Sequence, residues 1–149
     1  MEERAREFLE QHHSAAMVTL RPDGSPHVVR IGVAMVDGKL WSSGTQARVR
    51  TEHVRREPRS SLFVFDTDPG KAWRWLGLET TATIIEGSLA PEASLRLFRI
   101  MQAGMTPAPT PGTVVWEGAE KGPEEFLDIM RQERRLIYEF DIVRDYGMY

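Results

Sequence analysis

The chain has 149 residues, of which 41% are hydrophobic and 28% are charged, with a formal net charge of −3. These values exclude a disordered chain and predict one folded domain over residues 1–149, since enough apolar surface is present to build a core. The acidic balance argues against nucleic acid as the main partner, and the lack of cysteine excludes disulfides and thiolate chemistry.

The N-terminal segment has apolar residues Ala5, Phe8 and Leu9 spaced along one helical face, a pattern that ends at Gln11. The segment is highly charged and lacks the apolar centre of a secretory signal, and no later run is long and apolar enough to cross a bilayer. We therefore predict a short amphipathic helix, in a cytoplasmic protein with no membrane partner.

Three runs rich in β-forming residues follow at 15–20, 26–36 and 39–44. They are separated by Asp23-Gly24 and by Asp37-Gly38, which favour tight turns. The spacing predicts three antiparallel strands in a meander.

The middle of the chain has a helical pattern followed by two strand patterns. Residues 46–57 are polar, charged and free of glycine and proline, which predicts a helix that ends before Pro58. Residues 61–66 read as a strand. Residues 71–89 alternate and are rich in aromatic and β-branched side chains, so we expect one long bent strand with a bulge at Gly77.

The C-terminal part begins with a helical pattern from Pro91 to Gly104. Residues 105–122 contain several prolines and predict an extended loop or surface arm. A short helix at 124–132 and a closing strand at 134–143 complete the chain. The element order predicts a mainly β fold of about six strands, closed into a barrel and flanked by small helices.

The first candidate site is the segment Ser42–Thr45 and the helix after it. A strand that turns through small hydroxyl residues into a helix offers free backbone N–H groups and a positive dipole end, which suit a phosphate. Five arginines lie within twelve residues there: Arg48, Arg50, Arg55, Arg56 and Arg59. A solvated, capped surface helix explains the same pattern, and the local sequence leaves both readings open.

Two further segments are suited to a planar ring. The strand that begins at Pro26 has small and apolar residues that let a ring lie along its backbone. Arg30 on this strand is unusual for a barrel wall, and an edge arginine paired with a carboxylate is the alternative. Trp73 and Trp75 fall on one strand face, where they pack on a ring, on a second subunit or in the core.

The common catalytic templates are absent. The four histidines do not have metal-ligand spacing, so we predict no metal site. No glycine-rich dinucleotide loop, P-loop or nucleophile elbow occurs either. Any catalysis must therefore depend on a bound organic cofactor.

Four segments, taken in order, resemble the pyridoxamine-phosphate-oxidase-like split-barrel family, in particular its branch that uses the deazaflavin coenzyme F420. They are residues 15–35, 48–64, 72–84 and 133–147. The resemblance implies a six-stranded antiparallel split β-barrel of the FMN-binding type. It also implies a homodimer that builds two coenzyme sites at its interface.

The same resemblance implies roles for individual residues. Arg48 and Arg50 take the positions of the basic residues in the family's helix pattern, and His53 stands where asparagine is common. The expected phosphate ligands are Ser43, Thr45, Arg48 and Arg50. The strand that carries Pro26, Val28 and Arg30 is expected to lie along the ring. Trp73 and Trp75 are expected to line the pocket, partly from the second subunit.

The function implied is an oxidoreductase that transfers hydride from reduced F420 to a conjugated or tetrapyrrole-like small-molecule acceptor, as in the biliverdin reductase branch. Arg30 or Arg74 is the candidate to stabilise charge on the acceptor, and Arg55, Arg56 and Arg59 are candidates to meet the coenzyme's glutamate tail. The alternatives are an FMN-dependent oxidase or reductase of the pyridoxamine phosphate oxidase type and a non-catalytic coenzyme or haem carrier. The Arg-x-Val-Leu-Leu-Lys pattern of the FMN oxidases is absent, which favours F420.

Overall fold

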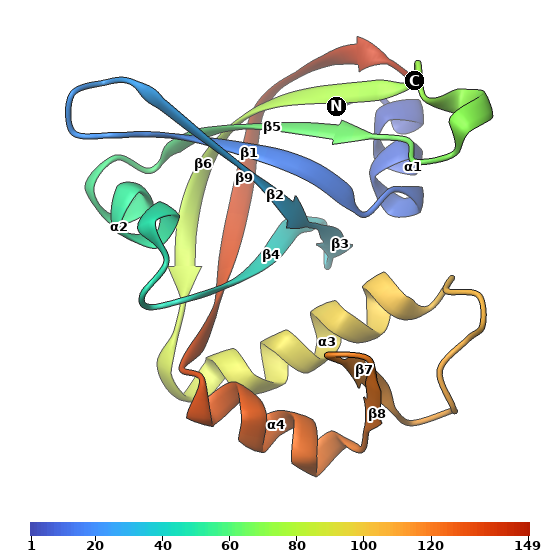
Figure 1. Ribbon diagram of the computed structural model, residues 1–149. Coiled ribbons are helices and arrows are strands. Elements are labelled where there is room, and N and C mark those ends of the chain that lie inside the picture. Colours follow the sequence, from blue (N-terminus) through green and yellow to red (C-terminus); the bar gives the residue numbers. More distant parts are fainter.

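A computed structural model describes all residues from 1 to 149, and its main feature is one curled antiparallel sheet (Figure 1). The strands of this sheet are β1 (Ser14–Leu20), β2 (Pro26–Gly32), β3 (Ala34–Val36), β4 (Lys39–Thr45), β5 (Arg59–Phe65), β6 (Trp75–Ile85) and β9 (Arg135–Met148). The helices are α1 (Glu3–Gln11), α2 (Val49–Arg56), α3 (Ala90–Gln102) and α4 (Pro123–Gln132). None of them combines the length and the apolar run that crossing a bilayer requires.

The order of strands in the sheet is β2-β1-β5-β6-β9-β4-β3. Its two outermost strands, β2 and β3, are consecutive in the chain and meet at Val33, whose N–H donates to the carbonyl of His13 at 2.9 Å. The sheet therefore curls so that its two edges are one kinked stretch of chain. If β2 and β3 are counted as that one stretch, the predicted six-stranded split barrel is confirmed.

The predicted meander needs correction. The run at 26–36 is two strands rather than one, because the chain bends at the buried Val33 and changes partner. β2 pairs with β1, whereas β3 pairs with β4. β4 then pairs with β9 from the far end of the sequence. The β4–β9 pairing depends on contacts distant in sequence, so local strand patterns could not predict it.

The barrel interior is filled by alternate side chains of the strands and is closed at one end by α1. Phe8 and Leu9 of α1 are fully buried with strand residues such as Met17 and Leu78. The long pair β6–β9 is irregular between Glu79 and Thr80, not at the predicted Gly77. Gly77 is instead covered by the ring of Tyr146, which leaves no room for a side chain there.

A second, smaller layer lies below the barrel and consists of α3, α4 and the hairpin β7 (Val114–Trp116)–β8 (Ala119–Lys121) (Figure 1). The predicted arm at 105–122 is therefore partly regular structure. The Trp116 ring packs edge-on against Phe98 and Phe126, with ring centroids 5.4 and 5.9 Å away. The aromatic contacts explain why the hairpin lies against the helices instead of extending into solvent.

Candidate functional site

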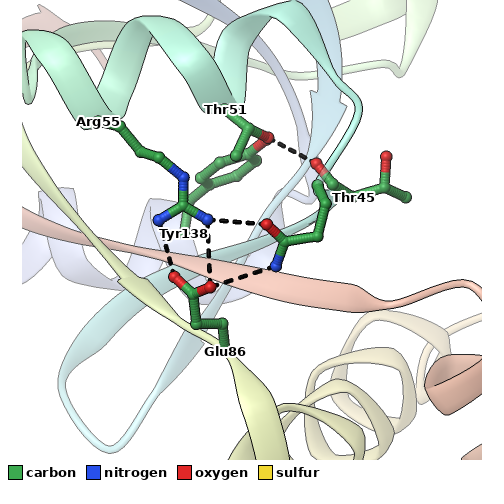
Figure 2. Close-up of polar contacts among 6 residues, drawn as sticks. Thr45, Thr51, Arg55, Glu86 and Tyr138 are labelled. Atoms are coloured by element: carbon green, nitrogen blue, oxygen red, sulfur yellow. Dashed lines mark hydrogen bonds and ion pairs between the residues drawn. The ribbon is translucent and has the colours of Figure 1, made fainter.

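Helix α2 follows β4 at one end of the barrel. It begins at Val49 rather than at the predicted residue 46, because the chain first turns, with the Arg48 N–H bound to the Thr45 carbonyl at 3.3 Å. No side chain caps its N-terminus. Thr51 in the first turn is buried, donates its hydroxyl hydrogen to the Thr45 carbonyl at 2.7 Å and also contacts the Tyr138 hydroxyl (Figure 2). The positive end of α2 is thus held against the end of β4.

Gly44 explains how β4 comes so close to Tyr138 of β9. A Cβ atom at this position would lie 2.6 Å from Cζ of the Tyr138 ring. Only glycine leaves room for the ring, because real Cβ contacts are never that short. The tyrosine in turn anchors α2 through Thr51.

Arg50 extends from the first turn of α2 over the Tyr138 ring, with its guanidinium carbon 5.6 Å from the ring centroid. Its Nη2 donates to the Ser43 carbonyl at 3.3 Å, and no carboxylate lies within ion-pair distance. Burial is the main cause that lowers the pKa of Arg50, and the positive charges of Arg48 and Arg135 act in the same direction. A desolvated cation without a counter-charge favours the binding of an anion.

Two buried polar atoms beside this cation lack a partner. They are Nε of Arg50 and Oγ of Ser43. Buried polar groups are almost always hydrogen-bonded, so each orphan needs an explanation. Both atoms can donate to phosphate oxygens, and the uncapped N-terminus of α2 adds backbone N–H groups. These residues therefore fit the phosphate of a coenzyme.

The other arginines of the segment differ in their contacts. Arg48 is exposed at the start of α2 and makes no ion pair. Arg55, by contrast, binds Glu86 through hydrogen bonds of 2.8 and 3.2 Å (Figure 2). Arg56 donates to the Leu20 carbonyl, and Arg59 binds Glu57 at 2.7 Å. Arg48, Arg50 and Arg56 thus have no carboxylate partner, and of these three only Arg48 and Arg50 lie at the N-terminal end of α2.

His53, at the family's asparagine position, points away from this corner. It is buried, and its Nδ1 lies 2.8 Å from the Thr19 hydroxyl of β1. Its ring meets the edge of His27 at 5.2 Å. Burial lowers the pKa of His53, and His27 adds to the effect. The residue fastens α2 to the sheet.

The residues expected along the ring all lie on the outer face of the sheet. Pro26, Val28 and Arg30 are exposed on the edge strand β2. Arg30 makes one long contact, of 3.5 Å with the Ser14 hydroxyl, and no ion pair. The alternative of an edge arginine paired with a carboxylate therefore does not describe it.

Of the two tryptophans, Trp75 extends the same outer face, whereas Trp73 lies in the turn before the strand and not on it as predicted. Trp75 stacks on Phe63 with ring centroids 5.2 Å apart and meets the edge of Tyr146 at 6.1 Å. Trp73 precedes β6 and is 59% exposed. Several aromatic rings therefore lie open to solvent, and they can pack on another molecule.

One chain does not bring the tryptophans to the phosphate corner. β5 runs antiparallel to β6, so Phe65 pairs with Trp75 at one end while Arg59 pairs with Thr81 at the other. α2 lies near the Arg59 end and the tryptophans lie near α1 (Figure 1). The predicted phosphate ligands and the predicted aromatic wall are separated by the length of the sheet.

Arg74, a candidate to act on the acceptor, takes part in a cluster that fixes α1. Its guanidinium lies over the Phe8 ring at 5.2 Å and 3.4 Å from Asp66. His12 binds the same carboxylate at 3.1 Å. A hydrogen bond from the backbone of Asp68 is the largest cause that lowers the pKa of Asp66, ahead of His12 and Arg74. Arg74 therefore has structural contacts that Arg50 lacks.

The geometry defines a class: an antiparallel barrel protein with an unsatisfied cationic corner that fits a phosphate-bearing coenzyme. The chain belongs to the pyridoxamine 5′-phosphate oxidase family, whose model matches residues 1–119. This confirms the family that the four sequence segments predicted.

The chain is also similar to individual proteins of known sequence or structure. The chain is similar to an F420H2-dependent biliverdin reductase of Mycobacterium tuberculosis, with 34% identity over 116 residues, covering 74% of this chain and 77% of that protein. Among solved structures, an F420 reductase shares 19% identity with a TM-score of 0.68 and covers 98% of both chains. A conserved hypothetical protein of Mycobacterium tuberculosis has 23% identity and a TM-score of 0.72, covering 99% of this chain and 84% of that one. The two structures support the split-barrel fold.

Proposed function

We propose that the chain is an oxidoreductase that binds coenzyme F420, with the coenzyme phosphate at Ser43, Thr45, Arg48 and Arg50. The observation that carries this proposal is Arg50: a partly buried guanidinium with an unpartnered Nε, no carboxylate, and the unpartnered Ser43 hydroxyl beside it. A phosphate supplies the missing acceptors and the missing charge. The relative named for F420H2-dependent reduction of biliverdin supports the choice of coenzyme.

The residues of the chain would serve mainly to place the ring. When bound, reduced F420 supplies a hydride. Pro26 and Val28 offer a flat, apolar strip on the outer face of β2, on which a planar ring can lie. Arg30, with no ion pair of its own, is suited to bind an anionic acceptor or to stabilise negative charge that develops on it. No side chain has to act as a nucleophile.

We also propose that the outer face pairs with a second copy of the chain. The exposed rings of Phe63, Trp75 and Tyr146 form an aromatic surface that a partner would bury. In such a dimer, the tryptophans of one copy can complete the pocket that begins at α2 of the other. Such a dimer would bring together the tryptophans and the phosphate ligands, which lie at opposite ends of the sheet in a single chain. The cytoplasmic location stays a prediction.

The acceptor we propose is a conjugated, tetrapyrrole-like molecule. An open face with apolar strips and a free arginine suits a flat molecule that carries carboxylates. The similarity to a biliverdin reductase supports this class. Biliverdin is therefore the first acceptor to test.

The test begins with titration of the purified protein with F420 and with FMN, followed by tryptophan fluorescence. We expect F420 to bind more tightly, and tighter FMN binding would favour the FMN-dependent alternative. Reduced F420 is then mixed with biliverdin and protein, and its reoxidation is followed by absorbance. Tight binding of reduced F420 without reoxidation by biliverdin or other conjugated acceptors would favour a carrier. Sedimentation velocity measures whether the protein is a dimer.

A further inference from the structure

A cavity of about 630 Å³ lies next to the phosphate corner, between the loop after β4, the start of α3 and the turn from α4 into β9. Most of its lining residues are polar or charged, and three of them are arginines. The residues that matter here are Gln46, Glu86, Ser88, Arg131, Arg134 and Arg135. None of them was among the residues expected to bind the coenzyme.

The charges of the wall are strongly unbalanced. Glu86 is its only carboxylate, and Arg55 already neutralises it through two hydrogen bonds (Figure 2). Of the three wall arginines, Arg135 pairs with Glu133 at 3.0 Å, whereas the side chain of Arg134 makes no ion pair or hydrogen bond. Arg131 pairs with an exposed aspartate outside the wall, a contact that is weak in water. The cavity therefore keeps an excess of positive charge.

The backbone adds to this positive potential. Gly87, Ser88 and Pro91 line the cavity where α3 begins, and no side chain caps that helix. The N-terminus of a 13-residue helix favours negative charge. Arg134 also adopts a left-handed backbone conformation with φ of 50°, which is uncommon for a residue other than glycine but turns the chain directly into β9.

The cavity adjoins the phosphate corner. Gln46 directly follows Thr45, and Arg135 lies opposite Thr45 in the β4–β9 pair. Arg135 is also close enough to Arg50 for its charge to act on that guanidinium. A ligand bound through its phosphate at Arg50 can thus extend into the cavity without crossing the barrel.

We propose that this cavity binds the carboxylates of the oligoglutamate tail, which extends beyond the phosphate of F420. The inference rests on the proposed function, because it assumes F420 as the coenzyme. It moves the tail away from Arg55, Arg56 and Arg59, since these side chains are engaged within the protein. A chain of carboxylates matches a wall with several arginines better than a single anion does.

The experiment compares two forms of the coenzyme, one that ends before the first glutamate and one with several glutamates. Their dissociation constants are measured by tryptophan fluorescence at low ionic strength. The variant Arg131→Gln plus Arg134→Gln removes two cavity charges. The matched control, Arg96→Gln plus Arg99→Gln, also removes one ion-paired and one unpaired exposed arginine, both on α3 outside the cavity.

We expect the wild-type protein to bind the tailed form more tightly, and the cavity variant to lose about tenfold of that preference. Its affinity for the tail-free form should not change, and the control should behave as the wild type. Equal affinity of the wild type for both forms, or a cavity variant that keeps the preference, would overturn the proposal. Failure of the wild type to bind even the tail-free form would instead reject the proposed function, and this inference with it.

Discussion

Two arginines that the sequence marked as candidates lie at opposite ends of the barrel and differ in what surrounds them. Arg74, at the α1 end, contacts the Phe8 ring and Asp66, which His12 also binds. Arg50, at the α2 end, has no carboxylate and leaves its Nε without a partner. The protein satisfies one cation internally and leaves the other unsatisfied.

The different surroundings of Arg74 and Arg50 suggest that one contributes to stability and the other to ligand binding. A charge cluster whose members satisfy one another contributes to holding elements together, and its loss costs stability. A desolvated cation with open donors costs the free protein something and is compensated only when an anion binds. The α1 end should therefore respond to mutation in unfolding experiments, and the α2 corner in binding experiments.

The largest effect on stability is expected for Gly44→Ala, because it disturbs the contact between Tyr138 and Thr51 that holds α2 in place. The new methyl group would overlap the Tyr138 ring and displace it from Thr51. We expect a loss of about 3 kcal/mol in the free energy of unfolding, measured by urea denaturation. Gly104→Ala is the control, because its Cβ would meet open space. A Gly44→Ala protein as stable as the wild type would contradict the packing described.

The next effect tests the α1 end. Asp66→Ala leaves His12 and Arg74 without their shared carboxylate, so we expect it to lower the free energy of unfolding by about 2 kcal/mol. Coenzyme affinity of the folded protein should stay the same. The exposed Asp128→Ala serves as the control and should change stability by less than about 0.5 kcal/mol.

A smaller effect is expected when the unsatisfied cation itself is removed. Arg50→Met takes away one long hydrogen bond and a contact with the Tyr138 ring, but it also relieves the burial of an unpaired charge. We expect these terms to cancel within about 0.5 kcal/mol in urea denaturation. A strongly destabilised Arg50→Met protein would show that Arg50 serves the fold, as Arg74 does.

The smallest effect is a difference in pH dependence between the two ends. The lowered pKa of His53 means that the unfolded chain binds its proton more readily, so stability is lost as the pH falls below the ordinary value of 6.5. The lowered pKa of Asp66 acts only below its ordinary value of 3.8. Melting temperatures between about pH 7.5 and pH 5.5 should therefore fall less in His53→Asn than in the wild type. Parallel curves for the two proteins would contradict this account of His53.

The sequence predicted most of the sheet strands, the helices and the cationic corner because these depend on local patterns, but it missed the break at Val33 and the hairpin β7–β8. Turns at Asp23-Gly24 and Asp37-Gly38 and the arginines after Thr45 are visible without a structure. Which arginines remain free is not visible, because the partners Glu86 and Leu20 are distant in sequence from Arg55 and Arg56.

Two features were missed for the same reason. Tyr138 supports α2 from the last strand, and no local pattern links it to Thr51. The arginines at 131, 134 and 135 form a cavity only because β9 pairs with β4 and brings them beside Gln46. A cluster of three arginines at the end of a predicted helix was the available signal, but its position required the sheet order.

The most direct test of the central claim compares F420 binding by the wild type, Arg50→Met and Arg74→Met under the same conditions. If Arg50 holds the coenzyme phosphate, Arg50→Met should raise the dissociation constant about thirtyfold, whereas Arg74→Met should change it less than about threefold. An Arg50→Met protein that binds F420 as tightly as the wild type would contradict the account.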